Sequence, residues 1–395
     1  MSEPYTHTEH HENAVKDPPK PWAETYFHPS LLASKAYAID SGGDDIQVKI
    51  DQNESPWDVP VRLKQKILTT LENQQWNRYP SSQSEELTQK LGKYVNIAPK
   101  NILTGPGSNY LISLILSAMG TSLKGDVVIA RPSFGLFEAS CRYAGISYRT
   151  WDLGPHFEFL PQTLSPLPTG SLVVFASPNN PTGSVLPYED LQSLLESNRH
   201  SFFIADEAYF EFTERPVTEL LRNYDNLLII RTFSKSVGVA GIRFGYAIAS
   251  ETIIQQLTKL RLPYLLNHFT IVGASAILDD HEYMEQIHHQ MKQVIMERDQ
   301  MMKALENLTE TKNRLQISVF PSQGNFFLMK CPNQELGQQL YKELIKSRIL
   351  VRDVSNGPQL SGCLRISVGT PKDNQTFLET VKSIANQKKE EDNRG

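Results

Sequence analysis

Short, almost wholly apolar runs recur along the middle of the chain, separated by stretches with helical periodicity. The runs are VVIA (127–130), LVVFA (172–176), FFIA (202–205) and LLII (227–230). Runs that are apolar on both faces, with connections long enough to hold a helix, are typical of a mostly parallel sheet covered by helices. The pattern therefore predicts an α/β fold with helices on both faces of its sheet.

The segment SSQSEELTQKLGKYV, before the first run, has the pattern of an amphipathic helix. Leu87 and Leu91 share one helical face. Ser82 stands three residues before Glu85, which is the spacing of a capping box. The segment is therefore predicted to be a helix that packs on the sheet.

The pattern changes in the last third of the chain, where a long charged helical segment is followed by mixed helical and strand-like segments. We expect a large cofactor-binding domain over 55–279 and a smaller α+β domain over 280–386. An N-terminal arm over 23–54 is expected to join the smaller domain. The polar ends, 1–22 and 387–395, are expected to be a disordered leader and tail.

Composition and charge exclude several classes of protein. The 395 residues are 39% hydrophobic and 21% charged, as in ordinary globular proteins. A formal net charge of −5 argues against a broad basic surface for nucleic acid or an anionic membrane. No segment has the apolar length of a signal peptide or a membrane span. A cytoplasmic protein that binds small molecules is therefore expected.

The residues that commonly ligate metals do not form a site in the sequence. The three cysteines are widely spaced and lack a CxxC pair, so neither a disulfide framework nor a zinc site is indicated. His7, His10 and His11 could ligate a metal, but their polar, proline-broken surroundings favour a disordered segment. We therefore expect no metal.

Four polar or glycine-rich motifs follow the apolar runs directly. RPSFGLF (131–137) follows the first, SPNNPTG (177–183) the second, DEAYFEF (206–212) the third and RTFSKSVG (231–238) the fourth. All four stand at the carboxyl ends of the predicted strands. Ligands of open α/β sheets bind outside these ends, so the motifs are expected to meet on one side of the sheet.

A lysine within the fourth motif offers the chemistry of a covalent anchor. Lys235 is on a strand-to-helix turn and can form a Schiff base with an aldehyde, and pyridoxal phosphate is the common biological aldehyde held in that way. The pyridine nitrogen of that cofactor needs a carboxylate partner, which Asp206 can supply. Tyr209 and the amide of Asn180 can reach the 3-oxygen of the ring.

The phosphate of such a cofactor needs backbone N–H groups, hydroxyls and a fixed cation. The stretch GPGSNYLISLIL opens a predicted helix with Gly107, Ser108 and Asn109, and a helix N-terminus is an anion site. Ser234 and Arg243 are expected to complete the phosphate site. A nicotinamide-binding fold fits less well, because this stretch lacks the third glycine of that fingerprint.

These motifs resemble those of the aspartate-aminotransferase-like family, which is fold type I of the pyridoxal-phosphate enzymes. The resemblance is strengthened by QNESP (52–56), RYP (78–80), GNFFLMK (324–330) and LSGCLRISVGT (360–370). Within that family the motifs are most similar to those of histidinol-phosphate aminotransferases. The resemblance implies a homodimer that converts L-histidinol phosphate and 2-oxoglutarate into imidazole acetol phosphate and L-glutamate in histidine biosynthesis, in a ping-pong reaction.

The resemblance also implies roles that the motifs alone do not indicate. Phe134 is expected to stack on the cofactor ring, and Tyr79 to reach the phosphate site of the partner subunit. Asn53 and Arg365 are expected to line the substrate pocket. Two further candidates for holding the phosphate of the substrate are Arg352 and Tyr37.

Two departures from the pattern leave the amino donor open. The chain has Asn109 and Tyr110 where such enzymes commonly carry an acidic pair, and Phe134 where many have a tyrosine. An aromatic amino-acid aminotransferase and a decarboxylase of a phosphorylated amino acid are alternatives with the same fold. A cofactor-binding transcription regulator is disfavoured, because no basic helix-turn-helix segment is present.

Overall fold

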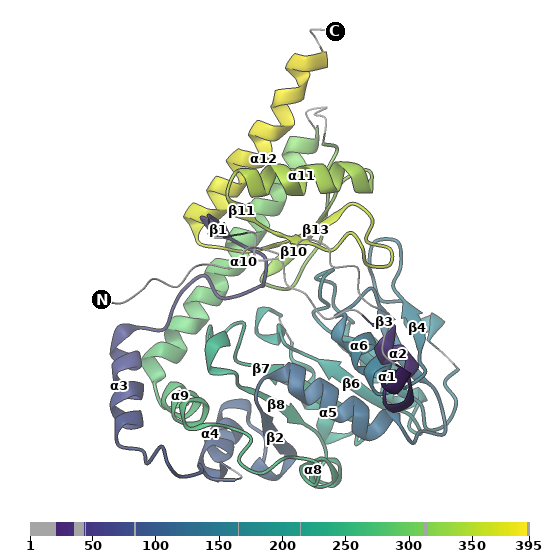
Figure 1. Ribbon diagram of the computed structural model, residues 1–395, viewed down its shortest axis with the longest axis vertical. Helices are drawn as coiled ribbons and strands as arrows, with labels where there is room; N and C mark the ends of the chain where they lie inside the picture. Colours follow the sequence, from purple (N-terminus) through teal and green to yellow (C-terminus); the bar gives the residue numbers. More distant parts are fainter. Residues whose placement is uncertain are drawn as a thin grey trace.

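The structure is a computed structural model that describes residues 21–34, 43, 45–82, 84–164, 166–213, 215–310 and 315–392. Tyr37 and the three histidines of the predicted leader lie outside these ranges. A large sheet with its helices occupies one end of the molecule, and a smaller unit of helices and strands occupies the other (Figure 1). Among the described residues, no helix combines the length and apolar character needed to cross a membrane.

The large sheet has seven strands in the order β2-β8-β7-β6-β5-β3-β4. Its strands are β2 (Ile102–Gly105), β3 (Val127–Arg131), β4 (Arg149–Asp152), β5 (Leu172–Ala176), β6 (Phe202–Asp206), β7 (Leu227–Thr232) and β8 (Gly245–Ile248). Strands β4, β3, β5, β6 and β7 pair in parallel, whereas β8 is antiparallel to both β2 and β7. The prediction of a mostly parallel sheet is therefore confirmed.

Helices cover both faces of this sheet, as the apolar runs predict. In β5, Val173 and Phe175 belong to the hydrophobic cluster on one face, and Leu172 and Val174 to the cluster on the other. The first cluster includes side chains of α3 (Val61–Glu72), α4 (Glu85–Val95), α7 (Tyr188–Ser197) and α9 (His268–Leu278). The second includes those of α5 (Ser108–Gly120), α6 (Leu136–Tyr143) and α8 (Glu251–Thr258). The predicted α/β class is confirmed.

Helix α4 lies where a helix was predicted, but the expected capping box is wrong. Ser84 rather than Ser82 is the N-cap residue, with φ 49° and no side-chain hydrogen bond to the helix. The N–H of Ser84 instead donates to the hydroxyl oxygen of Ser81, at 3.1 Å. Leu87 and Leu91 are fully buried, so the apolar periodicity, rather than a cap, identifies this helix.

The smaller unit is built on a four-stranded antiparallel sheet in the order β12-β13-β10-β9. Its elements are α10 (His281–Glu310), β9 (Ser318–Phe320), β10 (Phe326–Lys330), α11 (Gln334–Lys346), β11 (Ile349–Leu350), β12 (Arg352–Asp353), β13 (Cys363–Ser367) and α12 (Pro371–Asp392). Helix α12 continues past residue 386 to Asp392, and the predicted tail from residue 387 stays a prediction. The predicted domain boundaries stay a prediction.

The N-terminal part of the chain contacts both units. Helices α1 (Pro21–Tyr26) and α2 (Pro29–Leu32) lie near α6 on the outside of the large unit (Figure 1). Strand β1 (Val48–Lys49) then pairs in parallel with β11 of the smaller unit. The residues that follow β1 therefore pass between the two sheets, where they reach the cavity described next.

Candidate active site

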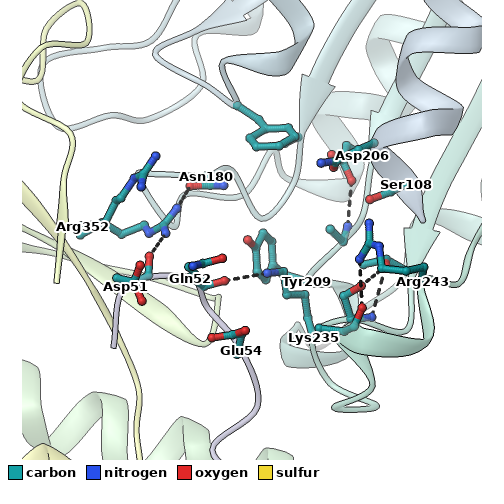
Figure 2. Close-up of a pocket in the computed structure, with 18 residues that line it drawn as sticks. Asp51, Gln52, Glu54, Ser108, Asn180, Asp206, Tyr209, Lys235, Arg243 and Arg352 are labelled. Carbon is teal, nitrogen blue, oxygen red and sulfur yellow. Dashed lines mark hydrogen bonds between the residues drawn. The ribbon is translucent and has the colours of Figure 1, made fainter. Parts of the chain in front are cut away.

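A cavity of about 360 Å³ lies at the carboxyl ends of β5, β6 and β7, against β12 and β13 of the smaller unit (Figure 2). Most of the predicted site residues line it, and they come from segments far apart in the sequence. These are Ser108, Asn109, Phe134, Asn180, Asp206, Tyr209, Ser234, Lys235, Arg243, Arg352 and Arg365. The expected meeting of the strand-end motifs on one side of the sheet is therefore observed.

Other lining residues were not predicted. They are Asp51, Gln52, Glu54, Ala176, Ala208, Thr232 and Ala240. The first three flank the predicted Asn53, Ala176 ends β5, and Ala208 and Thr232 lie within the motifs that follow β6 and end β7. Position within or next to a motif was the available signal for these residues, but it does not indicate which side chains face the cavity.

Lys235 is placed in the cavity by the turn that follows β7. Its Nζ donates a hydrogen bond to the carbonyl oxygen of Gln52, at 2.8 Å. Burial, together with the positive charge of Arg365, lowers the pKa of Lys235 to about 8. An appreciable fraction of this amine is therefore neutral near pH 7, and only a neutral amine can act as a nucleophile or a base.

Asp206 ends β6 at the opposite wall of the cavity. The N–H of Ala208 donates to its Oδ1 at 3.1 Å. Burial nevertheless raises the pKa of Asp206 to about 7. A carboxylate with so little solvation is stabilised by a cationic group in the cavity, and the protonated ring nitrogen of pyridoxal phosphate has that character.

Anion-binding groups converge at one end of the cavity. Gly107 is the N-cap of α5, and its φ of 88° is a backbone conformation that favours glycine. Ser108 is the first residue of that helix. The hydroxyl of Ser234 accepts a hydrogen bond from Thr232 at 3.0 Å. A helix N-terminus, hydroxyls and a guanidinium thus lie where the phosphate of the cofactor is needed, so the residues fit pyridoxal phosphate.

Asn179 joins the loops that carry Phe134 and Asn180. Its Nδ2 donates to the carbonyl oxygen of Pro132 and to Oγ1 of Thr182, both at 2.8 Å. Its Oδ1 accepts from Ser133 at 2.6 Å. Because the whole amide is used in this way, Asn179 holds the loops after β3 and β5 together and places their next residues at the cavity.

Two arginines from the smaller unit form the other end of the cavity. Nη1 of Arg365 donates to Oδ1 of Asn180 at 2.6 Å, and Nη2 donates to the carbonyl oxygen of Asp51. Arg352 lies directly opposite Arg365 on the neighbouring strand. Figure 2 shows Arg352 at one end and Arg243 at the other, with Tyr209 and Lys235 between them. Like charges on paired strands repel, so an anion between the two arginines is favoured.

Among the described residues, three predicted site residues are not part of the cavity lining: Gly107, Asn53 and Tyr79. Asn53 is fully buried beside it, and its Nδ2 donates to the hydroxyl of Tyr209 at 2.9 Å. Tyr79 is 79% exposed and stacks on Tyr264, with ring centroids 4.4 Å apart, outside the cavity of its own chain. Tyr37 lies outside the described residues. Within the described ranges, no group of three or more His, Cys, Asp or Glu side chains could hold a metal ion.

A buried ion pair lies directly behind the cavity. Nε and Nη2 of Arg231 on β7 donate to Oε2 of Glu207 at 2.9 and 2.7 Å. The other carboxyl oxygen of Glu207 accepts from the N–H of Val217 at 3.1 Å. The guanidinium also lies 3.4 Å from the ring centroid of Phe210. These contacts hold the turn that follows Asp206, and Tyr209 belongs to this turn.

Residues 45–381 match the family model of the class I and II aminotransferases. The chain belongs to this family. It is 34% identical over 346 residues to histidinol-phosphate aminotransferase from Ruminiclostridium cellulolyticum, covering 86% of this chain and 92% of the relative. It is 30% identical over 363 residues to the enzyme of the same name from Hydrogenobaculum, covering 91% and 99%. The predicted class of enzyme, an aminotransferase that depends on pyridoxal phosphate, is thereby confirmed.

Solved structures show the same fold. Histidinol-phosphate aminotransferase from Clostridium acetobutylicum matches with a TM-score of 0.75 and 25% identity, covering 86% of this chain and 99% of that chain. The enzyme from Sinorhizobium meliloti, in complex with pyridoxal 5'-phosphate, matches with a TM-score of 0.77 and 21% identity, covering 91% and 99%. The prediction of a fold type I enzyme is confirmed.

Proposed function

We propose that this aminotransferase transfers the amino group of L-histidinol phosphate to 2-oxoglutarate, which yields imidazole acetol phosphate and L-glutamate in histidine biosynthesis. We also propose that it acts in the cytoplasm as a homodimer, in which Tyr79 contributes to the neighbouring site. The names of the relatives support the substrate. The exposure of Tyr79 and its stacked neighbour Tyr264 suits a contact with a second chain.

The observation that carries the proposal is the presence of two separate anion-binding ends in one cavity. Arg243, Ser234 and the N-terminus of α5 suit the phosphate of the cofactor. Arg352 and Arg365 remain for a second anion, and the planar guanidinium group matches phosphate in a bidentate manner. An amino donor with its own phosphate would occupy this second end and place its amine near Lys235.

The side chains around Lys235 are suited to proton transfer. When bound, pyridoxal phosphate supplies an electron-poor ring that takes up electron density from the amine-bearing carbon of the substrate. Lys235 Nζ can remove the proton from that carbon and deliver it to the bound cofactor. Positioned acid–base catalysis of this kind contributes roughly 10²- to 10⁴-fold in rate. Asp206 holds negative charge at the far wall, and Arg365 orients the substrate.

A decarboxylase of a phosphorylated amino acid is the second candidate. L-Threonine-O-3-phosphate decarboxylase from Porphyromonas gingivalis has the same fold, with a TM-score of 0.72 at 22% identity. Its substrate, as that name gives it, also carries a phosphate, which the arginine pair could accept. The two candidates differ in their products, since only the decarboxylase releases carbon dioxide.

The test is a screen of amino donors against the purified enzyme loaded with pyridoxal phosphate. The donors are histidinol phosphate, histidinol, phenylalanine, tyrosine and threonine phosphate, and the spectral change of the bound cofactor reports each reaction. Histidinol phosphate should react at least about tenfold faster than histidinol, because charge-assisted hydrogen bonds contribute about 1.5–3 kcal/mol each. Equal rates for these two donors would contradict the proposal, and release of carbon dioxide from threonine phosphate would favour the decarboxylase.

A further inference from the structure

A buried chain of hydrogen bonds connects the smaller unit to Tyr209 in the cavity. The hydroxyl of Ser367, at the end of β13, donates to Oδ1 of Asn53 at 2.7 Å. Nδ2 of Asn53 then donates to the hydroxyl oxygen of Tyr209 at 2.9 Å. All three side chains are buried, with at most 5% exposure, so water does not compete for these bonds. These hydrogen bonds therefore connect the smaller unit, the N-terminal arm and the large sheet.

Asn53 is held on every side at the centre of this chain. Its N–H donates to Oγ of Ser367 at 2.8 Å, and its carbonyl oxygen accepts from Nδ2 of Asn325 at 2.9 Å. Its φ of 54° is in the left-handed region, which asparagine adopts more readily than other non-glycine residues. The amide orientation follows from these partners, because the carbonyl side faces a hydroxyl donor and the amino side faces Tyr209.

The direction of these bonds determines how the hydroxyl of Tyr209 is oriented. Its oxygen accepts from Asn53, so its own proton is directed away from Asn53. Tyr209 lines the cavity, and its ring packs edge-on against Phe326 of β10, with centroids 4.9 Å apart. Strand β10 pairs with β13, and Phe326 lies opposite Ser367. The ring and the hydroxyl of Tyr209 are thus both positioned from the same edge of the smaller sheet.

We propose that Ser367 is a positioning residue for Tyr209, acting through Asn53, so that the Tyr209 hydroxyl is presented as a hydrogen-bond donor to the ring oxygen of bound pyridoxal phosphate. The proposal assigns Asn53 to the orientation of a tyrosine rather than to contact with the substrate. It rests on the proposed role of Tyr209 but not on the identity of the amino donor. Glutamate can therefore serve as the donor in its test.

Three substitutions test this relay of hydrogen bonds, which runs from Ser367 through Asn53 to Tyr209. Ser367→Ala removes the hydroxyl that fixes the Asn53 amide, and it should weaken pyridoxal phosphate binding and slow the glutamate half-reaction by about three- to tenfold, the range for one neutral hydrogen bond. Asn53→Asp retains the acceptor toward Ser367 but replaces the donor toward Tyr209 with a second acceptor, so it should have the larger effect. In a Tyr209→Phe background, Ser367→Ala should cause no further loss.

Ser171→Ala is the matched control. The hydroxyl of Ser171 is also buried, donates to the carbonyl oxygen of Pro168 at 2.6 Å and accepts from the N–H of Asp126 at 3.1 Å, but it lies away from the cavity, before β5. The control should lower the Tm as Ser367→Ala does, while leaving the dissociation constant of pyridoxal phosphate and the half-reaction unchanged.

Each result supports or overturns the relay. The cofactor dissociation constant is measured by titrating the cofactor-free protein, so it does not depend on turnover. The relay is wrong if Ser367→Ala, like Ser171→Ala, leaves the cofactor dissociation constant and the half-reaction rate unchanged. It is also wrong if Ser367→Ala changes these quantities by the same factor in the unmodified protein and in the Tyr209→Phe background. If Tyr209→Phe alone changes neither quantity, the proposed role of Tyr209 fails and the relay fails with it, whereas the donor screen is unaffected.

Discussion

Arg365→Lys tests the second anion-binding end of the cavity while keeping the positive charge. In the structure, Nη1 and Nη2 of Arg365 donate in different directions, to Asn180 and to the carbonyl oxygen of Asp51. The single Nζ of lysine cannot reproduce this fork or the bidentate contact with a phosphate. The substitution therefore removes at least one charge-assisted hydrogen bond in a side chain that is only 8% exposed.

The expected loss is about 1.5–3 kcal/mol, which corresponds to roughly a 10- to 150-fold lower kcat/KM for histidinol phosphate. The assay is the donor half-reaction, run with histidinol phosphate and with unphosphorylated histidinol. The loss should be much smaller for histidinol, and the cofactor content should stay unchanged because Arg243 and Ser234 are intact.

Arg149→Lys is the control. Arg149 lies on the edge strand β4, is partly exposed, and its Nε lies 2.8 Å from Oδ2 of Asp126. It should leave both donors unaffected. If Arg365→Lys lowers the rates for both donors by the same factor, Arg365 does not bind the phosphate of the donor. An unchanged rate for histidinol phosphate would show that Arg365 does not bind this donor.

Three further predictions concern the charges buried at the sheet edge. Asp206→Asn should slow the half-reaction by roughly 10- to 150-fold, the range for a hydrogen bond to a charged group. Because burial raises the pKa of Asp206 from 3.8 to about 7, the carboxylate destabilises the cofactor-free fold increasingly as pH rises toward 7, and the Tm of the variant should not show this decrease. Burial lowers the pKa of Lys235 from 10.5 to about 8, so the charged amine destabilises the fold fully below pH 8 and less as pH rises to 10.5. Lys235→Met should therefore raise the Tm of the cofactor-free protein at pH 7, and an equal rise in Tm at pH 10 would contradict this. Arg231→Met should lower the free energy of unfolding, measured with denaturant, by about 3–5 kcal/mol, because it leaves the carboxylate of Glu207 buried and unpaired. Adding Glu207→Gln should restore most of that loss, and a double variant as unstable as the single one would show that the ion pair is not the cause.

The sequence predicted the fold class and most of the cavity because both depend on local patterns. An apolar run followed by a polar motif is a strand and its carboxyl end, so Asp206 and Lys235 could be placed at one edge before any contact was known. The antiparallel direction of β8 could not be predicted, because an apolar run has the same pattern in either direction.

The partners of buried polar groups are the part that the sequence did not predict. Asn53 was expected to line the substrate pocket, yet its amide contacts Tyr209 and Ser367, which are 156 and 314 residues away in the chain. No local pattern encodes a bond of that separation. Tyr79 was expected to act in a neighbouring subunit, and its contact with a second chain stays a prediction.

The most direct test of the account is to locate the covalent attachment of the cofactor. The enzyme loaded with pyridoxal phosphate is reduced with borohydride, digested and mapped by mass spectrometry, with Lys235→Ala treated in the same way. We expect the label on Lys235 alone and none on the variant, because Lys235 is the lysine that lines the cavity among the described residues. A label on any other lysine in the unmodified sequence would contradict the assignment of the active site.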